Sequence, residues 1–187
     1  MANDGAGDGG TDGGTLADLF GGGAKGKWVL DTNRSRAEFA VRHFWGAITV
    51  KGRFERIQGE GTMAEDGSVN GVLTIEAASL TTKNTRRDGH LRSADFFDVP
   101  NHPSVFVRVT GVTPGPGGEV AVTATLEAAG RSQPLRTTAR VLEVNPNAIT
   151  LAVTTVVDRT AFGMTWSPLG TASTSATLDI ATRFVRG

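Results

Sequence analysis

Apolar and polar residues alternate along most of the chain from residue 28 onward, which is the pattern of strands with one buried face and one wet face. Three valines at 105, 107 and 109, for example, alternate with Phe106 and Arg108. The same alternation occurs at 37–41, 73–75, 120–126, 149–153 and 176–180. We therefore predict an all-β domain of about eight strands.

Turn-forming residues separate these runs. Asp66-Gly67, the Pro-Gly-Pro-Gly-Gly run at 114–118 and the Asn-Pro-Asn run at 145–147 are of the types that reverse a chain. About eight antiparallel strands between residues 28 and 184 fit an up-and-down barrel or a sandwich. A barrel of this strand number is filled by its side chains or holds one small ligand.

One stretch, residues 82–103, does not alternate and is rich in charge. Asp88 is suited to cap a short helix that begins near Gly89, with Leu91, Ala94 and Phe97 facing the barrel. The two prolines that follow are expected to end the helical segment. A polar connection of this length inside a β domain is a usual place for function.

Residues 1–26 have a different composition, with ten of the 25 glycines and four aspartates. The apolar area that this stretch could bury is too small to offset the conformational entropy lost on ordering. We therefore predict a disordered tail at 1–26 and one domain at 27–187. Leu16, Leu19 and Phe20 interrupt the tail with helical i, i+3, i+4 spacing. They form either a chance apolar patch or a short segment that docks to a partner or plugs a groove.

Composition excludes several classes of function. The 19 bases balance 19 acids, which argues against nucleic acid as a partner. The absence of cysteine excludes disulfides and thiolate chemistry. No apolar run is long enough for a transmembrane helix, and no export signal precedes the domain, so we expect a cytoplasmic protein. The composition is compatible with both a monomer and a homodimer.

The residues for metal or cofactor chemistry are not spaced as such sites require. His43, His90 and His102 show neither HxH nor HExxH spacing, and no GxSxG nucleophile turn or phosphate-binding glycine loop is present. We therefore expect neither a metal ion nor a cofactor.

Residues 87–99, with the sequence RDGHLRSADFFDV and followed by Pro103, resemble the signature of the YceI family. Shorter segments agree: WVLD at 28–31, FAVRH at 39–43 followed by GRF at 52–54, and DRTAFGM at 158–164. The resemblance implies an eight-stranded antiparallel, lipocalin-like barrel, here with a short helical insertion near residues 85–98. It also implies an apolar tunnel that binds polyisoprenoid chains or other amphiphilic lipids.

The inward-facing residues of the alternating runs are the candidates to line such a tunnel. Alternation shows which residues share a face, but it leaves open whether that face encloses a void or a packed core. These candidates are Phe39, Val41, Leu73, Ile75, Val107, Val122, Leu126, Leu151, Val153 and Leu178.

A second set is polar and is expected at the tunnel mouth: His43, Arg86, Arg87, Asp88, His90 and Arg159. In one interpretation these residues hold an anionic head group. In the other they stabilise the loop, with Asp88 as a helix cap and with Arg87 and Arg159 paired to Asp158, Asp95 or Asp31.

The sequence thus favours non-covalent binding, sequestration or transport of a polyisoprenoid or similar long-chain amphiphile. Two alternatives from other classes stay open. An enzyme with Asp88, His90 and Arg159 at its mouth could cyclise or isomerise a lipophilic chain. A structural or interaction protein could use the Leu16–Phe20 segment to dock.

Overall fold

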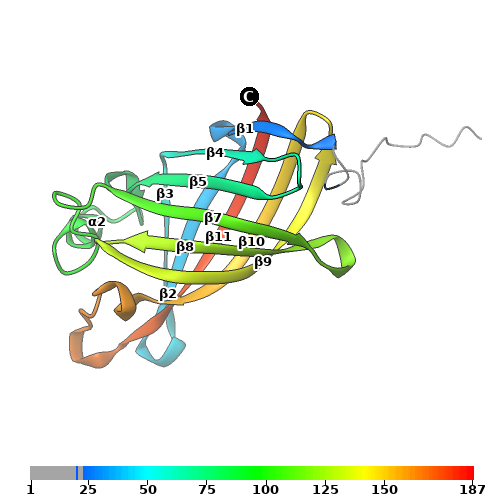
Figure 1. The fold of residues 1–187 in the computed structure, drawn as a ribbon. Coiled ribbons are helices and arrows are strands. Elements are labelled where there is room, and N and C mark those ends of the chain that lie inside the picture. Colours follow the sequence, from blue (N-terminus) through cyan, green and yellow to red (C-terminus); the bar gives the residue numbers. More distant parts are fainter. Residues whose placement is uncertain (1–19, 21–22) are drawn as a thin grey trace, which may run out of the picture.

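The protein is described by a computed structural model that covers Phe20 and residues 23–187. Eight antiparallel strands form a closed ring, because the last strand pairs back with the first and places Trp28 opposite Arg186 (Figure 1). In ring order the strands are β1 (Gly26–Leu30), β4 (Ile57–Met63), β5 (Val69–Glu76), β7 (Ser104–Pro114), β8 (Glu119–Ala128), β9 (Arg131–Asn145), β10 (Ala148–Asp158) and β11 (Ala172–Arg186). The predicted eight-stranded antiparallel barrel is therefore confirmed.

Three further strands extend this barrel at one end. They are β2 (Arg36–His43), β3 (Ile48–Phe54) and β6 (Leu80–Thr81). A 3₁₀ turn at Thr32–Arg34 separates β2 from β1, and the long strand β11 pairs with both. β1 and β2 are thus two halves of one interrupted strand.

The predicted turns lie where the chain reverses between β4 and β5, β7 and β8, and β9 and β10. In the first of these turns the side chain of Asp66 accepts a 2.9 Å hydrogen bond from the backbone N–H of Ser68. The alternation is also confirmed, since Val105 is buried and Arg108 is exposed on the same strand.

The helical insertion is confirmed as α2 (Thr85–Arg92), but its predicted ends were wrong. Asn84, not Asp88, caps the helix by accepting a 3.0 Å bond from the N–H of Arg87. The helix stops at Ser93, well before the prolines, because residues 93–98 fold into turns that bond back to it. Ala94 is exposed there, although it was expected to face the barrel.

Several described residues that precede residue 27 pack against the barrel. Ala24 is buried and its carbonyl accepts a 2.7 Å bond from the indole N–H of Trp28. Gly26 already belongs to β1, and Phe20 packs against the cluster around Trp28. Residues 1–19 and 21–22 of the predicted tail, including Leu16 and Leu19, lie outside the described residues.

Candidate functional site

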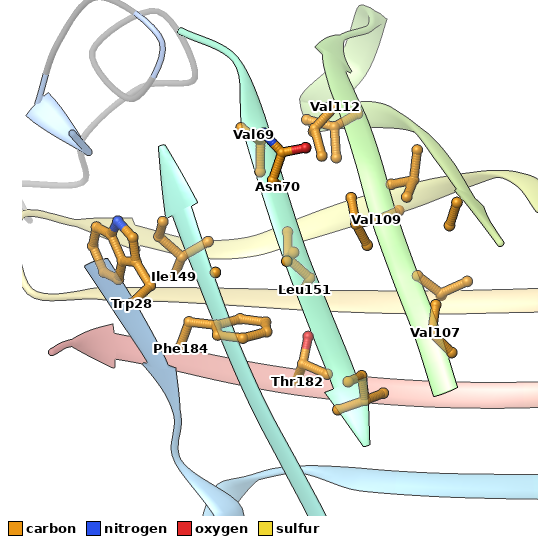
Figure 2. Close-up of a pocket in the computed structure, with 18 of the residues that line it drawn as sticks. Trp28, Val69, Asn70, Val107, Val109, Val112, Ile149, Leu151, Thr182 and Phe184 are labelled. Atoms are coloured by element: carbon orange, nitrogen blue, oxygen red, sulfur yellow. The ribbon is translucent and has the colours of Figure 1, made fainter. Parts of the chain in front are cut away.

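Two apolar cavities lie inside the barrel. Cavity 1, of about 200 Å³, lies at the β1 end, and Figure 2 shows side chains from β1, β5, β7, β10 and β11 around it. Cavity 2, of about 130 Å³, lies under α2. The walls of the two cavities share Val107, Leu135 and Ile180. The two cavities are therefore adjacent, and these three side chains lie between them.

The interior is hollow rather than filled. Leu151, Val153 and Ile180 point inward, yet each stays partly exposed because its end faces open space. Small residues at wall positions, such as Ala124 and Ala139, leave that space unfilled. A packed core would bury all of these side chains fully.

All ten predicted lining residues lie on these walls. Leu73, Val122, Leu151 and Val153 line cavity 1, Val107 lines both cavities, and cavity 2 has Phe39, Val41, Ile75, Leu126 and Leu178. Their contact with a ligand stays a prediction.

Sequence reasoning missed other parts of the wall. Leu135 of β9 alternates with Arg136 and Arg140, and that alternation could have revealed it. Phe162 and Met164 follow β10 outside any alternating run, so no local pattern indicated them.

A glycine shapes the wall of cavity 2. The ring of Phe39 lies over Gly52, where an added Cβ would come within 2.3 Å of the ring. The same ring packs against Phe54 at 5.6 Å between centroids, and Phe54 packs edge-on against Phe97. Gly52 therefore allows an aromatic wall to form between β2, β3 and the segment after α2.

Arg159 is a buried cation on the wall of cavity 2, with only 6% of its surface exposed. Its Nε donates to the carbonyl of Ser173 at 2.8 Å, and its Nη1 donates to the carbonyls of Met164 and Trp166. Burial lowers the pKa of Arg159, although the charge of Asp158 acts in the opposite direction. Among the described residues, no carboxylate forms an ion pair with it.

Arg159 and Arg87 both lie near enough to His43 for their positive charges to act on it. Burial, then the charge of Arg159, then that of Arg87 lower the pKa of His43. The Arg87 side chain itself donates to the hydroxyl of Thr82 at 2.7 Å and to the carbonyl of Thr82 at 3.1 Å. This end of the barrel therefore favours an anionic group.

The ion pairs expected for Arg87 and Arg159 were wrong. Asp158 accepts bonds from Thr160 instead, and Asp95 contacts His90. Both arginines bond to backbone or hydroxyl oxygens, which leaves their charge without a carboxylate within the described chain.

Asp88 stabilises the fold and lines neither cavity. Its buried carboxylate accepts bonds from the N–H and hydroxyl of Thr82 and from the hydroxyl of Thr81. Burial alone would raise the pKa of Asp88, but these hydrogen bonds and the charge of Arg92 lower it below its ordinary value. Asp88 thus ties α2 to β6.

The remaining two mouth candidates are His90 and Arg86, and neither lines a cavity. His90 Nε2 is 2.9 Å from Asp95, and its ring meets Trp166 edge-on at 4.5 Å between centroids. Arg86 is exposed on α2. Of the six predicted mouth residues only Arg159 contributes to a cavity wall, and their joint role in holding a head group stays a prediction.

The described residues contain no group of three or more side chains that could hold a metal ion. They also include no helix long and apolar enough to cross a bilayer.

A closed barrel of eight antiparallel strands around an apolar interior defines a lipocalin-like fold. The sequence profile of the YceI-like domain matches residues 28–184, and the chain belongs to this family.

Relatives with similar sequences carry the name UPF0312 protein. One from Vibrio cholerae serotype O1 is 30% identical over 112 residues, which is 58% of this chain and 59% of the relative. One from Vibrio campbellii is 32% identical over 126 residues, which is 64% of this chain and 65% of the relative. The chain thus spans about six tenths of the length of the curated relatives that it matches.

Solved structures share the fold at lower identity. Burkholderia cenocepacia BcnA superposes with a TM-score of 0.74 at 14% identity, over 82% of this chain and 98% of that one. A polyisoprenoid binding domain from Saccharophagus degradans gives 0.70 at 18% identity, over 86% and 98%. The Campylobacter jejuni YceI protein gives 0.65 at 23% identity, over 74% and 85%.

Proposed function

We propose that the barrel binds, sequesters or transports a polyisoprenoid or a similar long-chain amphiphilic lipid. The observation that carries this proposal is the pair of adjacent apolar cavities that share Val107, Leu135 and Ile180. We infer that a bound chain occupies both cavities as one passage, with a constriction at these three side chains. Along β7 the lining extends from Val105 to Val112, which is about 24 Å at a rise of roughly 3.4 Å per residue. An extended chain suits this shape better than a compact ligand. The polyisoprenoid binding domain of Saccharophagus degradans has the same fold.

The apolar chain of the ligand supplies most of the affinity. Each buried methylene contributes about 0.8 kcal/mol. Most residues that line cavity 1 are apolar, and the polar ones include Asn70 and three threonines, Thr137, Thr155 and Thr182. Such a surface accepts chains of many structures, so the wall selects for length and width more than for chemical detail.

Arg159 orients the chain in this proposal. A buried guanidinium without a carboxylate partner favours a negatively charged or strongly accepting head group in cavity 2. A hydrogen bond to a charged group adds about 1.5–3 kcal/mol. The head group would therefore lie at the α2 end, and the chain would extend past the constriction into cavity 1.

The enzymatic alternative needs a titratable group that reaches the bound chain. Of the three residues considered for that role, Asp88 is engaged with Thr81 and Thr82, and His90 is engaged with Asp95. Arg159 alone lines a cavity, and a guanidinium stays protonated at neutral pH. These contacts favour binding without chemistry.

Native mass spectrometry of the purified protein, followed by organic extraction, tests the proposal. We expect a prenyl or other long-chain lipid bound in stoichiometric amount, and we expect the delipidated protein to take up an added prenyl lipid. A protein that is empty when purified and takes up no prenyl lipid of any length would refute the proposal.

A further inference from the structure

Exposed apolar side chains gather at one end of the barrel. Among the described residues eight large apolar side chains are exposed, and five of them lie on two loops or at the first residue of β3. Trp45 is 93% exposed and Leu169 is 98% exposed. We call these five the apolar tip: Phe44, Trp45, Ile48, Trp166 and Leu169. The other three are scattered over separate strands, as single exposed apolar residues commonly are.

The two loops lie side by side. Trp45 is in the 3₁₀ turn between β2 and β3, and Leu169 is in the 3₁₀ turn that precedes β11. The N–H of Phe44 donates a 2.8 Å bond to the carbonyl of Thr171, and His43 pairs with Ala172. In Figure 1 the cyan β2–β3 turn and the orange loop project from the same end of the barrel. Trp45 and Leu169 therefore belong to one surface.

The backbone at this tip is strained. Phe44, Trp45 and Leu169 have φ values of 50°, 55° and 54°, in the left-handed region that bulky side chains rarely adopt. Glycine or asparagine would suit these turns better. Large side chains held there in solvent contribute little packing to the fold. Strain and exposure together indicate a surface that meets a partner.

The β2–β3 side of the tip is basic. Residues 39–52 and 163–174 contain no aspartate or glutamate. Arg42 and Lys51 are exposed on the outer face of the β2–β3 hairpin and are diagonal neighbours, since Arg42 pairs with Thr49 and Lys51 with Ala40. Arg42 is the next-to-last residue of β2 and lies three residues before Trp45 in the sequence.

We propose that the apolar tip docks onto the surface of an anionic lipid bilayer. Trp45 and Leu169 insert at the boundary between head groups and chains, and Arg42 and Lys51 meet anionic head groups. A fluid lipid surface suits two convex, strained turns, whereas a protein partner would need a matching pocket for each.

Docking onto a membrane extends the proposed function, because it gives the barrel a place to take up or release a lipid. This part of the inference rests on the proposed function. β2 and β11 carry the tip, and the same strands line cavity 2 through Val41 and Ala176. Docking would therefore bring the Arg159 end of the passage to the membrane from which an amphiphile is taken or to which it is delivered.

Sedimentation with vesicles tests the docking. We expect the wild type to bind phosphatidylglycerol-containing vesicles, to bind phosphatidylcholine vesicles more weakly, and to lose affinity as salt is added. Trp45→Ser and Leu169→Ser should each weaken binding at least tenfold, and Arg42→Gln or Lys51→Gln about fivefold. Leu142→Ser is the matched control, because Leu142 is an exposed apolar residue on β9 and lies outside the tip. Its binding should equal that of the wild type.

A wild type that ignores anionic vesicles, or a Trp45→Ser variant that binds them as the wild type does, would overturn the docking proposal. Self-association that needs Trp45 and occurs without vesicle binding would also overturn it, and would assign the tip to an interface between two copies. Uptake of a prenyl lipid in detergent-free solution is measured separately. Vesicle binding without any such uptake would refute the proposed function and leave the docking intact.

Discussion

The Nε of Arg159 donates a 2.8 Å hydrogen bond to the carbonyl oxygen of Ser173, which ties the end of β10 to the start of β11. The same guanidinium holds the carbonyl of Trp166 in the loop between those strands, at 3.1 Å. The buried guanidinium of Arg159 thus holds the loop between β10 and β11 in place and puts a positive charge on the wall of cavity 2. These two roles can be separated by substitution.

Arg159→Met should destabilise the protein by about 3 kcal/mol, because three carbonyl groups lose their donor. It should also reduce the affinity for an anionic amphiphile about tenfold or more, relative to an uncharged chain of equal length. Arg159→Lys keeps the positive charge but loses the hydrogen-bond geometry of the guanidinium. This variant should therefore keep most of the preference for an anionic head group and lose much of the free energy of unfolding. Urea unfolding and parallel titrations with the two ligands check this. Unchanged preference in a folded Arg159→Met variant would assign Arg159 a structural role alone.

The affinity for an anionic amphiphile should increase as the pH falls below about 6.5, the ordinary pKa of histidine. His43 is neutral at pH 7, because burial and the charges of Arg159 and Arg87 lower its pKa. A bound anion offsets that repulsion and raises the pKa, so binding takes up a proton. Calorimetric titrations between pH 7.5 and 5 would measure this, with an uncharged ligand and His43→Gln expected to show no such increase.

The same histidine should lower the stability of the ligand-free protein in acid. The unfolded chain binds the His43 proton more readily than the native chain does, because the native pKa is the lower one. The free energy of unfolding therefore decreases as the pH falls from the unfolded pKa towards the native pKa, and this contribution is constant below that window. Unfolding curves of the wild type and His43→Gln should diverge only below about pH 6.5.

Asp88→Asn should destabilise the protein by about 1–3 kcal/mol at pH 7, since a buried acceptor of three hydrogen bonds loses its charge. The folded pKa of Asp88 is below its ordinary value, so its contribution is present above the unfolded pKa and is lost as the pH falls through the folded pKa. The wild type should thus lose stability below about pH 4, and the variant should lose less. Asp95→Asn, which removes an exposed carboxylate, is the control. Equal acid sensitivity of the Asp88→Asn variant and the wild type would contradict this account.

Val122→Trp should shorten the longest chain that the barrel accepts. Val122 lines cavity 1 and pairs with Thr137. An indole at position 122 would fill the part of cavity 1 that we propose holds the end of the chain farthest from the head group. Each methylene excluded should weaken binding about fourfold, while chains short enough for cavity 2 alone should bind as before. Val156→Trp, on the outer face of β10, is the matched control. Affinities for a series of prenyl alcohols of increasing length would show the break.

Local sequence determined the strands, their faces and their turns. Side chains of a strand point alternately to its two faces, so the valines at 105, 107 and 109 were assigned to one face without knowledge of their neighbours. Turn types such as Asp66-Gly67 likewise depend on the φ and ψ of two or three residues. That is why the ten predicted lining residues all face the interior, although their order along the passage could not be predicted.

Tertiary structure alone decided whether the interior is hollow and which polar residues meet. The interior is hollow when the inward-facing side chains of all strands together do not fill the volume that the closed sheet encloses. The sequence of a single strand does not determine that total. Arg159 reaches Ser173 fourteen residues further along the chain, and Phe44 bonds to Thr171 across more than a hundred residues. Such distances follow from strand register and barrel closure. The sequence by itself therefore determined which face each residue occupies, and only the closed sheet decided what that face encloses.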